Sequence, residues 1–136
     1  MKIIKDKFFI SPSDLNNFVA CKYTIKNEIK FLNKEITKNT DRVNDKLWKE
    51  MGIKHEKKHH KILKSKFKKN IEIKSAKDEQ TRFDETVAAM QKGYDLIYHA
   101  YLIDENFRGE ADFLIKTNTP SDLGDYSYEV YDTKIT

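Results

Sequence analysis

The apolar positions keep a helical period over the first part of the chain and alternate in its last third. Ser11-Pro12-Ser13-Asp14 is typical of a helix start, with Ser11 as N-cap and Asp14 as capping partner, and helical spacing continues to about residue 34. After a break over residues 37–45, a second, longer helix is predicted, with lysines on the opposite face. Its apolar face would carry Val43, Leu47, Met51, His55, His59, Ile62 and Phe67.

Shorter elements are predicted beyond the long helix. A strand at 71–74 precedes a helix near 81–92, which should end at Gly93. Residues 96–103 and 107–116 flank a tight turn and should pair as an antiparallel hairpin. A loop with Pro120 and Gly124 leads to a last strand over residues 126–135. These elements predict an α/β fold with a mixed sheet flanked by helices.

Composition narrows the class of protein. The 136 residues, 38% of them apolar, suit one globular domain over residues 1–136. There is no run of about 18 apolar residues and no signal-peptide pattern, which predicts a cytoplasmic protein with no membrane partner. Cys21 is the only cysteine, so this chain alone cannot form a disulfide or a cysteine-based metal site, and buried packing is its expected role.

Positive charge is concentrated in residues 54–69, which hold eight lysines and one acid although the net charge of the chain is only +4. On a helix, one stripe would carry Lys57, Lys61, Lys64 and Lys68. Such a stripe suits contact with nucleic-acid phosphates. The alternative is a solvated face on a lysine-rich protein.

Acidic residues interrupt the last two predicted strands. Strict alternation puts Tyr128, Val130, Asp132 and Lys134 on one strand face and Glu129, Tyr131 and Thr133 on the other. In the preceding strand, Asp112 interrupts an apolar series. If the two strands are neighbours, Asp112 and Asp132 can converge on one divalent cation, since Mg²⁺ and Mn²⁺ prefer carboxylate oxygens.

These residue types suit phosphodiester hydrolysis. A cation held by Asp112 and Asp132 would activate water and polarise the phosphate, while Lys134 would orient the nucleophile and offset developing charge. The alternative is structural: a salt bridge between Asp132 and Lys134, with Asp112 capping a turn.

The segments Gly109-Glu110-Ala111-Asp112 and Asp132-Thr133-Lys134 resemble the G-x-x-D and D-x-K elements of the RecB-like branch of the PD-(D/E)xK nucleases. The segments SPSDLNNFVAC, GIKHE, 86–98 and PSDLG extend the resemblance over nearly the whole chain. It implies a restriction-endonuclease-like core and metal-dependent hydrolysis of DNA, with RNA left open, in DNA repair, recombination or nucleic-acid processing.

The same resemblance implies roles for further residues. His55 would add a metal ligand to Asp112 and Asp132, and the carbonyl of Thr133 is a further possible contact. Glu56 and Glu129 are weaker candidates. RecB-like nucleases continue past the D-x-K strand, so the resemblance implies an amino-terminal fragment, incomplete at its C-terminus, of a protein with further C-terminal domains. Some relatives hold an iron–sulfur cluster, which here would need ligands outside this chain.

Two alternatives compete with the nuclease. His55-Glu56-Lys57-Lys58-His59 matches the H-E-x-x-H zinc-protease signature, in which two histidines bind Zn²⁺ and the glutamate is the general base. A zinc protease needs a third ligand, for which Glu79 can be proposed. The two lysines inside the motif, Lys57 and Lys58, disfavour a bound cation. The other alternative is a nucleic-acid-binding module of a larger multidomain protein that does not cleave.

Overall fold

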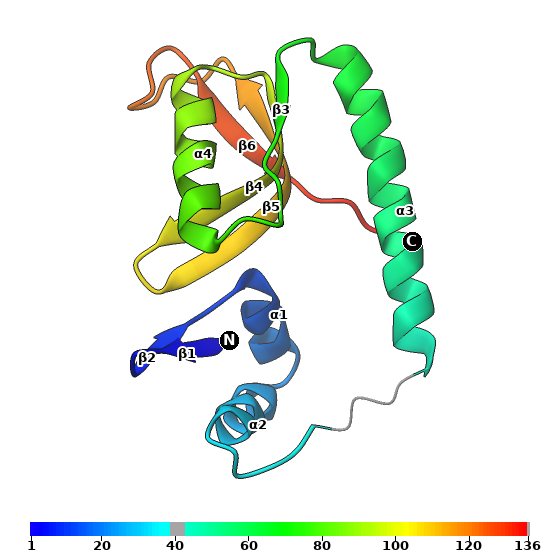
Figure 1. The fold of residues 1–136 in the computed structure, drawn as a ribbon, viewed down its shortest axis with the longest axis vertical. Helices are drawn as coiled ribbons and strands as arrows, with labels where there is room; N and C mark the ends of the chain where they lie inside the picture. Colours follow the sequence, from blue (N-terminus) through cyan, green and yellow to red (C-terminus); the bar gives the residue numbers. More distant parts are fainter. Residues whose placement is uncertain (39–42, 136) are drawn as a thin grey trace. The chain divides into compact units, whose positions relative to one another are not determined.

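The computed structural model describes residues 1–38 and 43–135 (Figure 1). These residues form four helices, a two-stranded sheet and a four-stranded sheet. The chain divides into two compact units, one of Met1–Arg42 with Ile103–Gly109 and the other of Val43–Leu102 with Glu110–Thr136. We call them the first and the second unit and describe each by itself.

The first unit opens with a hairpin that the sequence pattern did not predict. Strands β1 (Lys2–Ile4) and β2 (Lys7–Phe9) pair antiparallel. Their turn residues, Lys5 and Asp6, both have positive φ, at 48° and 61°. This is the backbone conformation of the two-residue turns that match the twist of a hairpin. Neither turn residue is glycine or asparagine, so the usual sequence signal for such a turn is missing.

Two helices follow where the sequence predicted one. Helix α1 (Pro12–Ala20) starts as expected, with the Ser11 backbone N–H donating to Asp14 Oδ2 at 2.8 Å. Helix α2 (Lys22–Leu32) is separate, because Cys21 adopts an extended conformation with φ −160° and ψ 113°. The prediction of one helix to residue 34 is therefore wrong. Cys21 is also exposed, which contradicts its expected buried packing.

The second unit is built on a mixed four-stranded sheet in the order β3-β4-β5-β6, which confirms the expected α/β class. Strand β3 (Asn70–Glu72) pairs parallel with β4 (Leu96–Asp104), close to the strand predicted at 71–74. Strand β5 (Phe107–Thr117) follows a turn at residues 105–106, as predicted. Strand β6 (Ser127–Tyr131) pairs antiparallel with β5, with Phe113 opposite Tyr131.

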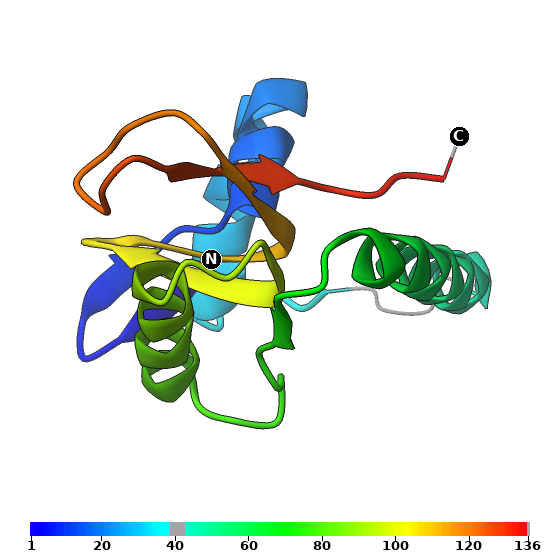
Figure 2. The ribbon, with the colours of Figure 1, turned by 90° about the horizontal axis from the view of Figure 1, so that it is seen from above.

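One helix lies along a face of this sheet in Figure 2, and a second contacts the other face near its own C-terminal end. On one face, Ala89 and Met90 of α4 (Glu79–Gln91) pack against a cluster that includes Ile97 and Leu114. Helix α4 ends as predicted, with Gly93 in the left-handed region at φ 65°. On the other face, Leu63 of α3 (Val43–Lys66) joins the second cluster. That cluster contains Leu96, Tyr98, Phe113, Phe67 and Ile115.

The side of helix α3 that is half-buried overlaps only in part with the apolar face that was predicted. Leu47, Met51 and Ile62 are 57%, 43% and 51% exposed, so the predicted face is buried only in part, at His55, His59 and Phe67. The half-buried positions of the helix are Gly52, His55, Glu56, His59, His60 and Leu63, of which only His55 and His59 belong to the predicted face. On this face Glu56 is hydrogen-bonded to Tyr98 and His99 of the sheet, and His60 stacks on Tyr98. The break expected over 37–45 falls partly on residues 39–42, outside the described residues.

Strand β4 contains a local irregularity at His99, whose φ is 56°. Side chains of α4 satisfy the backbone there. Arg82 Nη2 donates to His99 O at 3.2 Å, and the Tyr101 N–H donates to Thr86 Oγ1 at 3.0 Å. Both α4 residues are buried, and Arg82 also forms an ion pair with Glu110. The irregular strand is thus supported by hydrogen bonds that the polar side of α4 provides.

Among residues 1–38 and 43–135, no helix combines the length and the apolar content needed to cross a bilayer.

Candidate active site

The side chain of Asp112 on β5 is hydrogen-bonded to the segment that follows β6. Continuing the register of Phe113 and Tyr131 by one residue brings Asp112 opposite Asp132. The backbone N–H and the Oγ1 of Thr133 both donate to Asp112 Oδ2, at 2.9 and 3.0 Å. The carboxylate of Asp112 is therefore held in a fixed orientation by the residue between Asp132 and Lys134.

Asp132 and Lys134 do not lie on a strand. Strand β6 ends at Tyr131, so the strand predicted over 126–135 is too long and the strict alternation predicted for Asp132 and Lys134 is wrong. The physical reason is that Thr133 bonds to the Asp112 side chain in place of a strand backbone. Without alternation, residues 131–134 all line one pocket.

The two carboxyls interact electrostatically. Burial raises the pKa of Asp112, and the adjacent Asp132 carboxyl adds to this rise against the hydrogen bonds from Thr133. Burial also acts to raise the pKa of Asp132, but hydrogen bonds from Lys134 and Asp112 outweigh it and lower that pKa. Lys134 forms an ion pair with Asp132, which raises the pKa of Lys134. Without a cation, a proton is therefore held more readily on Asp112 than on Asp132.

A pocket of about 530 Å³ connects this segment to α3. His55 and His59 of α3 line this pocket. Their rings are in edge-to-face contact, with centroids 4.6 Å apart. Asp132 and Lys134 line it too, so His55 shares a pocket with two of the predicted site residues. Asp112 is not part of the lining, but its carboxylate accepts hydrogen bonds from Thr133, which is. The sequence did not predict the remaining lining residues, which are Leu63, Lys66, Phe67, Phe113, Ile115 and Tyr131.

The donor set suits a hard divalent cation in part. Asp112 and Asp132 are adjacent carboxyls; burial chiefly raises the pKa of Asp112 and Asp132 adds to the rise, and a bound cation would favour the charged form of both. Among residues 1–38 and 43–135, however, no group of three His, Cys, Asp or Glu side chains is close enough to hold a metal. Asp112 and Asp132 would supply carboxylate oxygens, and water and a substrate oxygen usually complete the coordination of Mg²⁺.

Glu56 takes part in a network that the sequence did not predict. Its Oε1 accepts a hydrogen bond from the Tyr98 hydroxyl at 2.6 Å and lies 2.6 Å from His99 Nε2. His60 stacks on Tyr98 with ring centroids 3.8 Å apart, and burial lowers the pKa of His60. The only sequence signal was two polar aromatic residues, Tyr98 and His99, in an apolar strand.

This network does not favour the zinc-protease alternative. Glu56, the general base of that motif, is directed to Tyr98 and His99 and does not line the pocket of His55 and His59. Glu79 begins α4 and does not line that pocket either.

The predicted lysine stripe is exposed, as contact with phosphates requires. Lys57, Lys61 and Lys64 lie on α3, whereas Lys68 lies two residues beyond its end and outside the helical stripe. Glu129, the weak ligand candidate, is exposed and accepts a hydrogen bond from Tyr131 at 3.2 Å.

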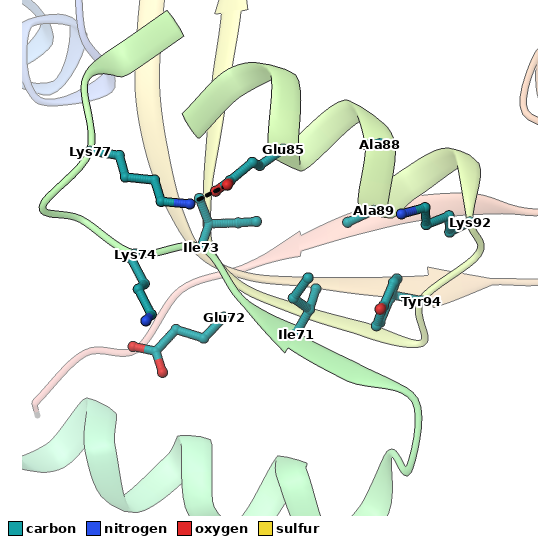
Figure 3. Close-up of a pocket in the computed structure, with 10 residues that line it drawn as sticks. All are labelled: Ile71, Glu72, Ile73, Lys74, Lys77, Glu85, Ala88, Ala89, Lys92 and Tyr94. Carbon is teal, nitrogen blue, oxygen red and sulfur yellow. Dashed lines mark hydrogen bonds and ion pairs between the residues drawn. The ribbon is translucent and has the colours of Figure 1, made fainter. Parts of the chain in front are cut away.

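A second pocket, of about 380 Å³, lies between β3 and α4 (Figure 3). An ion pair between Lys77 and Glu85 lies on its lining, beside Ile71, Ile73 and Ala89. None of the predicted site residues lines this pocket, so it is separate from the site of Asp112 and Asp132.

No family model matches this chain, and the comparisons with curated proteins and with solved structures gave no match.

Proposed function

We propose that this chain is a divalent-metal-dependent nuclease that hydrolyses DNA phosphodiester bonds, built on a PD-(D/E)xK core of the RecB-like kind. One observation carries the proposal. Asp112, Asp132 and Lys134, which lie far apart from His55 in the sequence, come together with it around a single pocket and its adjoining segment. A salt bridge with no further role would not need a second carboxyl beside it.

The expected chemistry follows from these positions. Asp112 and Asp132 would hold Mg²⁺ or Mn²⁺, which supplies Lewis-acid polarisation of the phosphate when bound. Thr133 keeps the Asp112 carboxylate oriented through two hydrogen bonds. The Lys134 ammonium, next to Asp132, would offset the negative charge that develops on the phosphate. Lys66 lines the same pocket and would attract the nucleic-acid backbone.

The mixed sheet also supports the PD-(D/E)xK assignment. Asp112 lies on β5, and the D-x-K segment directly follows the neighbouring antiparallel strand β6. A helix that precedes the sheet in sequence brings His55 to the same pocket. This topology is thus compatible with a site to which β5, the segment after β6 and α3 all contribute residues.

A second candidate is a nucleic-acid-binding module that does not cleave. Two observations favour it: within the described residues no three metal-binding side chains are grouped, and Lys57, Lys61 and Lys64 are exposed on one helix. Binding by such a module would depend on these lysines and on salt, and would not depend on Asp132.

The test is cleavage of labelled single- and double-stranded DNA by the full chain with Mg²⁺, Mn²⁺ or EDTA. We compare the wild type with Asp112→Asn, Asp132→Ala and Lys134→Ala. Asp122→Ala and Lys46→Ala are matched controls, since both residues are exposed and neither lines the pocket. Loss of the Lys134 ammonium should lower the rate by roughly 10²- to 10³-fold.

Metal-dependent cutting that the two aspartate variants lose and the controls keep would support the nuclease. A folded wild-type protein that binds DNA and does not cut it with any of the metals would favour the binding module.

A further inference from the structure

We propose that His55 and His59 together form a two-histidine site for a transition-metal ion of the Zn²⁺ class. Such an ion differs in its chemistry from the hard cation proposed for Asp112 and Asp132. The two histidines are the part of the H-E-x-x-H motif that the proposed function does not use as a pair. The inference goes beyond that function, because a metal held by two histidines requires neither nucleic acid nor cutting.

The helix brings the two rings to one place. His55 and His59 are four residues apart on α3 (Val43–Lys66), and side chains with this spacing lie on the same face of a helix. Both residues are half-buried, and both line the pocket of about 530 Å³. They also lie well inside the helix, away from both of its ends. Helical hydrogen bonds therefore hold the two backbones in a fixed relation.

The separation of the rings suits one shared metal ion. Their centroids are 4.6 Å apart. Zn²⁺ binds an imidazole nitrogen at about 2.0–2.1 Å, so two imidazoles that meet one ion at roughly 90–110° have their centroids roughly 4.5–5.2 Å apart. The observed separation lies within this range. Binding therefore does not require the helix to deform.

Imidazole nitrogens select the class of cation. Zn²⁺, Cu²⁺ and Ni²⁺ accept imidazole ligands readily, whereas Mg²⁺ prefers oxygen. Asp132 lines the same pocket and can add a carboxylate oxygen. Within residues 1–38 and 43–135, no three His, Cys, Asp or Glu side chains are grouped closely enough to hold a metal. The two histidines would thus be the main protein ligands, and water would complete the coordination.

The lysines near this site weaken its attraction for a cation only slightly. Lys57 and Lys58, inside the motif, are both exposed. The Lys134 side chain is 75% exposed and forms an ion pair with Asp132, which offsets its charge. Charges that face water are screened over about 8–10 Å at ordinary ionic strength. Coordination by two nitrogens is therefore stronger than this residual repulsion.

The test is isothermal titration calorimetry of the full chain with Zn²⁺, and separately with Mg²⁺, in a buffer without nucleic acid. We expect the wild type to bind Zn²⁺ and His59→Ala to bind it at least about 10-fold more weakly. Even residues that only orient a metal ligand change metal affinity by about 10- to 100-fold, and a ligand itself should matter at least as much. Binding of Mg²⁺ should not change in His59→Ala.

Controls separate the pair from other zinc ligands. His60→Ala removes the neighbouring histidine, which stacks on Tyr98 and does not line the pocket. Cys21→Ser removes the exposed cysteine, which belongs to the other unit. Both variants should bind Zn²⁺ as the wild type does. His59→Gln retains a polar side chain and should weaken binding as alanine does, which provides a second variant if His59→Ala fails to fold by circular dichroism.

Two results would overturn the inference. If the rings only pack against each other, the wild type and both His59 variants bind Zn²⁺ equally or not at all. If Zn²⁺ binding is lost in Cys21→Ser or His60→Ala, the metal is held elsewhere.

The two proposals can fail separately, because the titration contains no substrate. Binding of Zn²⁺ that depends on His59, in a protein that cuts no DNA, would support the histidine pair and remove the nuclease. Metal-dependent cutting without such binding would leave the nuclease in place and remove the pair.

Discussion

Glu56 on α3 and His99 on β4 meet at 2.6 Å between Oε1 and Nε2, and the same oxygen accepts a hydrogen bond from the Tyr98 hydroxyl. This contact fixes α3 to the sheet one residue from His55. Because the Glu56 and His99 side chains are only about one-fifth exposed, their hydrogen bonds are poorly replaced by water.

We therefore expect Glu56→Ala to lower the free energy of unfolding by roughly 1–3 kcal/mol. Glu56→Gln keeps an acceptor for the Tyr98 hydroxyl and should lower the free energy of unfolding by a smaller amount. Urea denaturation followed by circular dichroism measures both. Glu50→Ala is the control, because Glu50 is exposed on the same helix. Equal stability of the Glu56→Ala and Glu50→Ala proteins would contradict a stabilising role for the contact.

Thr133 should affect catalysis through Asp112. Thr133→Val removes the 3.0 Å hydrogen bond from Oγ1 and keeps the one from the backbone N–H, so Asp112 is held less firmly. Loss of such a supporting partner typically costs about 10- to 100-fold in metal affinity or activity. Thr133→Ser keeps the hydroxyl and should stay near the wild-type rate. Cleavage rates across a Mn²⁺ titration distinguish the variants, and identical titrations for valine and serine would refute the prediction.

Thr86 should contribute to stability with no part in catalysis. Its buried hydroxyl accepts a hydrogen bond from the Tyr101 N–H and donates one to Arg82 O at 2.8 Å. Thr86→Val has nearly the same shape and removes both bonds, which should cost about 1–3 kcal/mol. Thr86→Ser retains the hydroxyl and should lower the free energy of unfolding by a smaller amount. Thermal melting of the two variants provides the comparison, and a valine variant as stable as the wild type would be inconsistent with this role.

Asp14 should make the first unit sensitive to acid. Burial acts to raise its pKa, but the Met1 ammonium and hydrogen bonds from Ser11 outweigh burial and lower the pKa of Asp14. A carboxyl with a lowered folded-state pKa stabilises the fold above its unfolded value, near 3.9, and this contribution is lost as the pH falls through the folded-state pKa.

The wild type should thus be more stable than Asp14→Asn at pH 6.5, and this advantage should shrink as the pH falls below about 4. Melting temperatures of both proteins between about pH 6.5 and pH 2.5 test this. An advantage that does not change with pH would mean that the charge of Asp14 is unimportant.

The second unit was largely predictable because its local signals agree with one another. Gly93 marks the end of α4, as the structure confirms, and the strands before and after the turn at residues 105–106 were expected to pair as a hairpin. The first unit was harder. A glycine or proline usually announces a helix break, but the break at Cys21 has neither. The β1–β2 turn likewise uses Lys5 and Asp6 in a conformation that glycine and asparagine favour.

For the candidate site, spacing identified the chemistry but not the geometry. Asp112, Asp132 and His55 were selected from residue type and resemblance, and their convergence required the sheet register. The early end of β6 could not be predicted, because it depends on Thr133 bonding to the side chain of Asp112, 21 residues earlier on the paired strand β5. Tyr98 and His99 were missed for a similar reason, since their partner Glu56 lies more than 40 residues away in sequence.

The Thr133 amide also offers a way to observe the site directly. This proton is held by a carboxylate at the end of a strand, outside any backbone ladder. Its exchange with solvent deuterium can therefore report the opening of this one hydrogen bond, which does not require the sheet to unfold. A ligand that orders Asp112 should slow the exchange at Thr133, while the amides in the middle of β5 keep their rates. A single backbone N–H would thus record occupancy of the site even in a protein that cuts nothing.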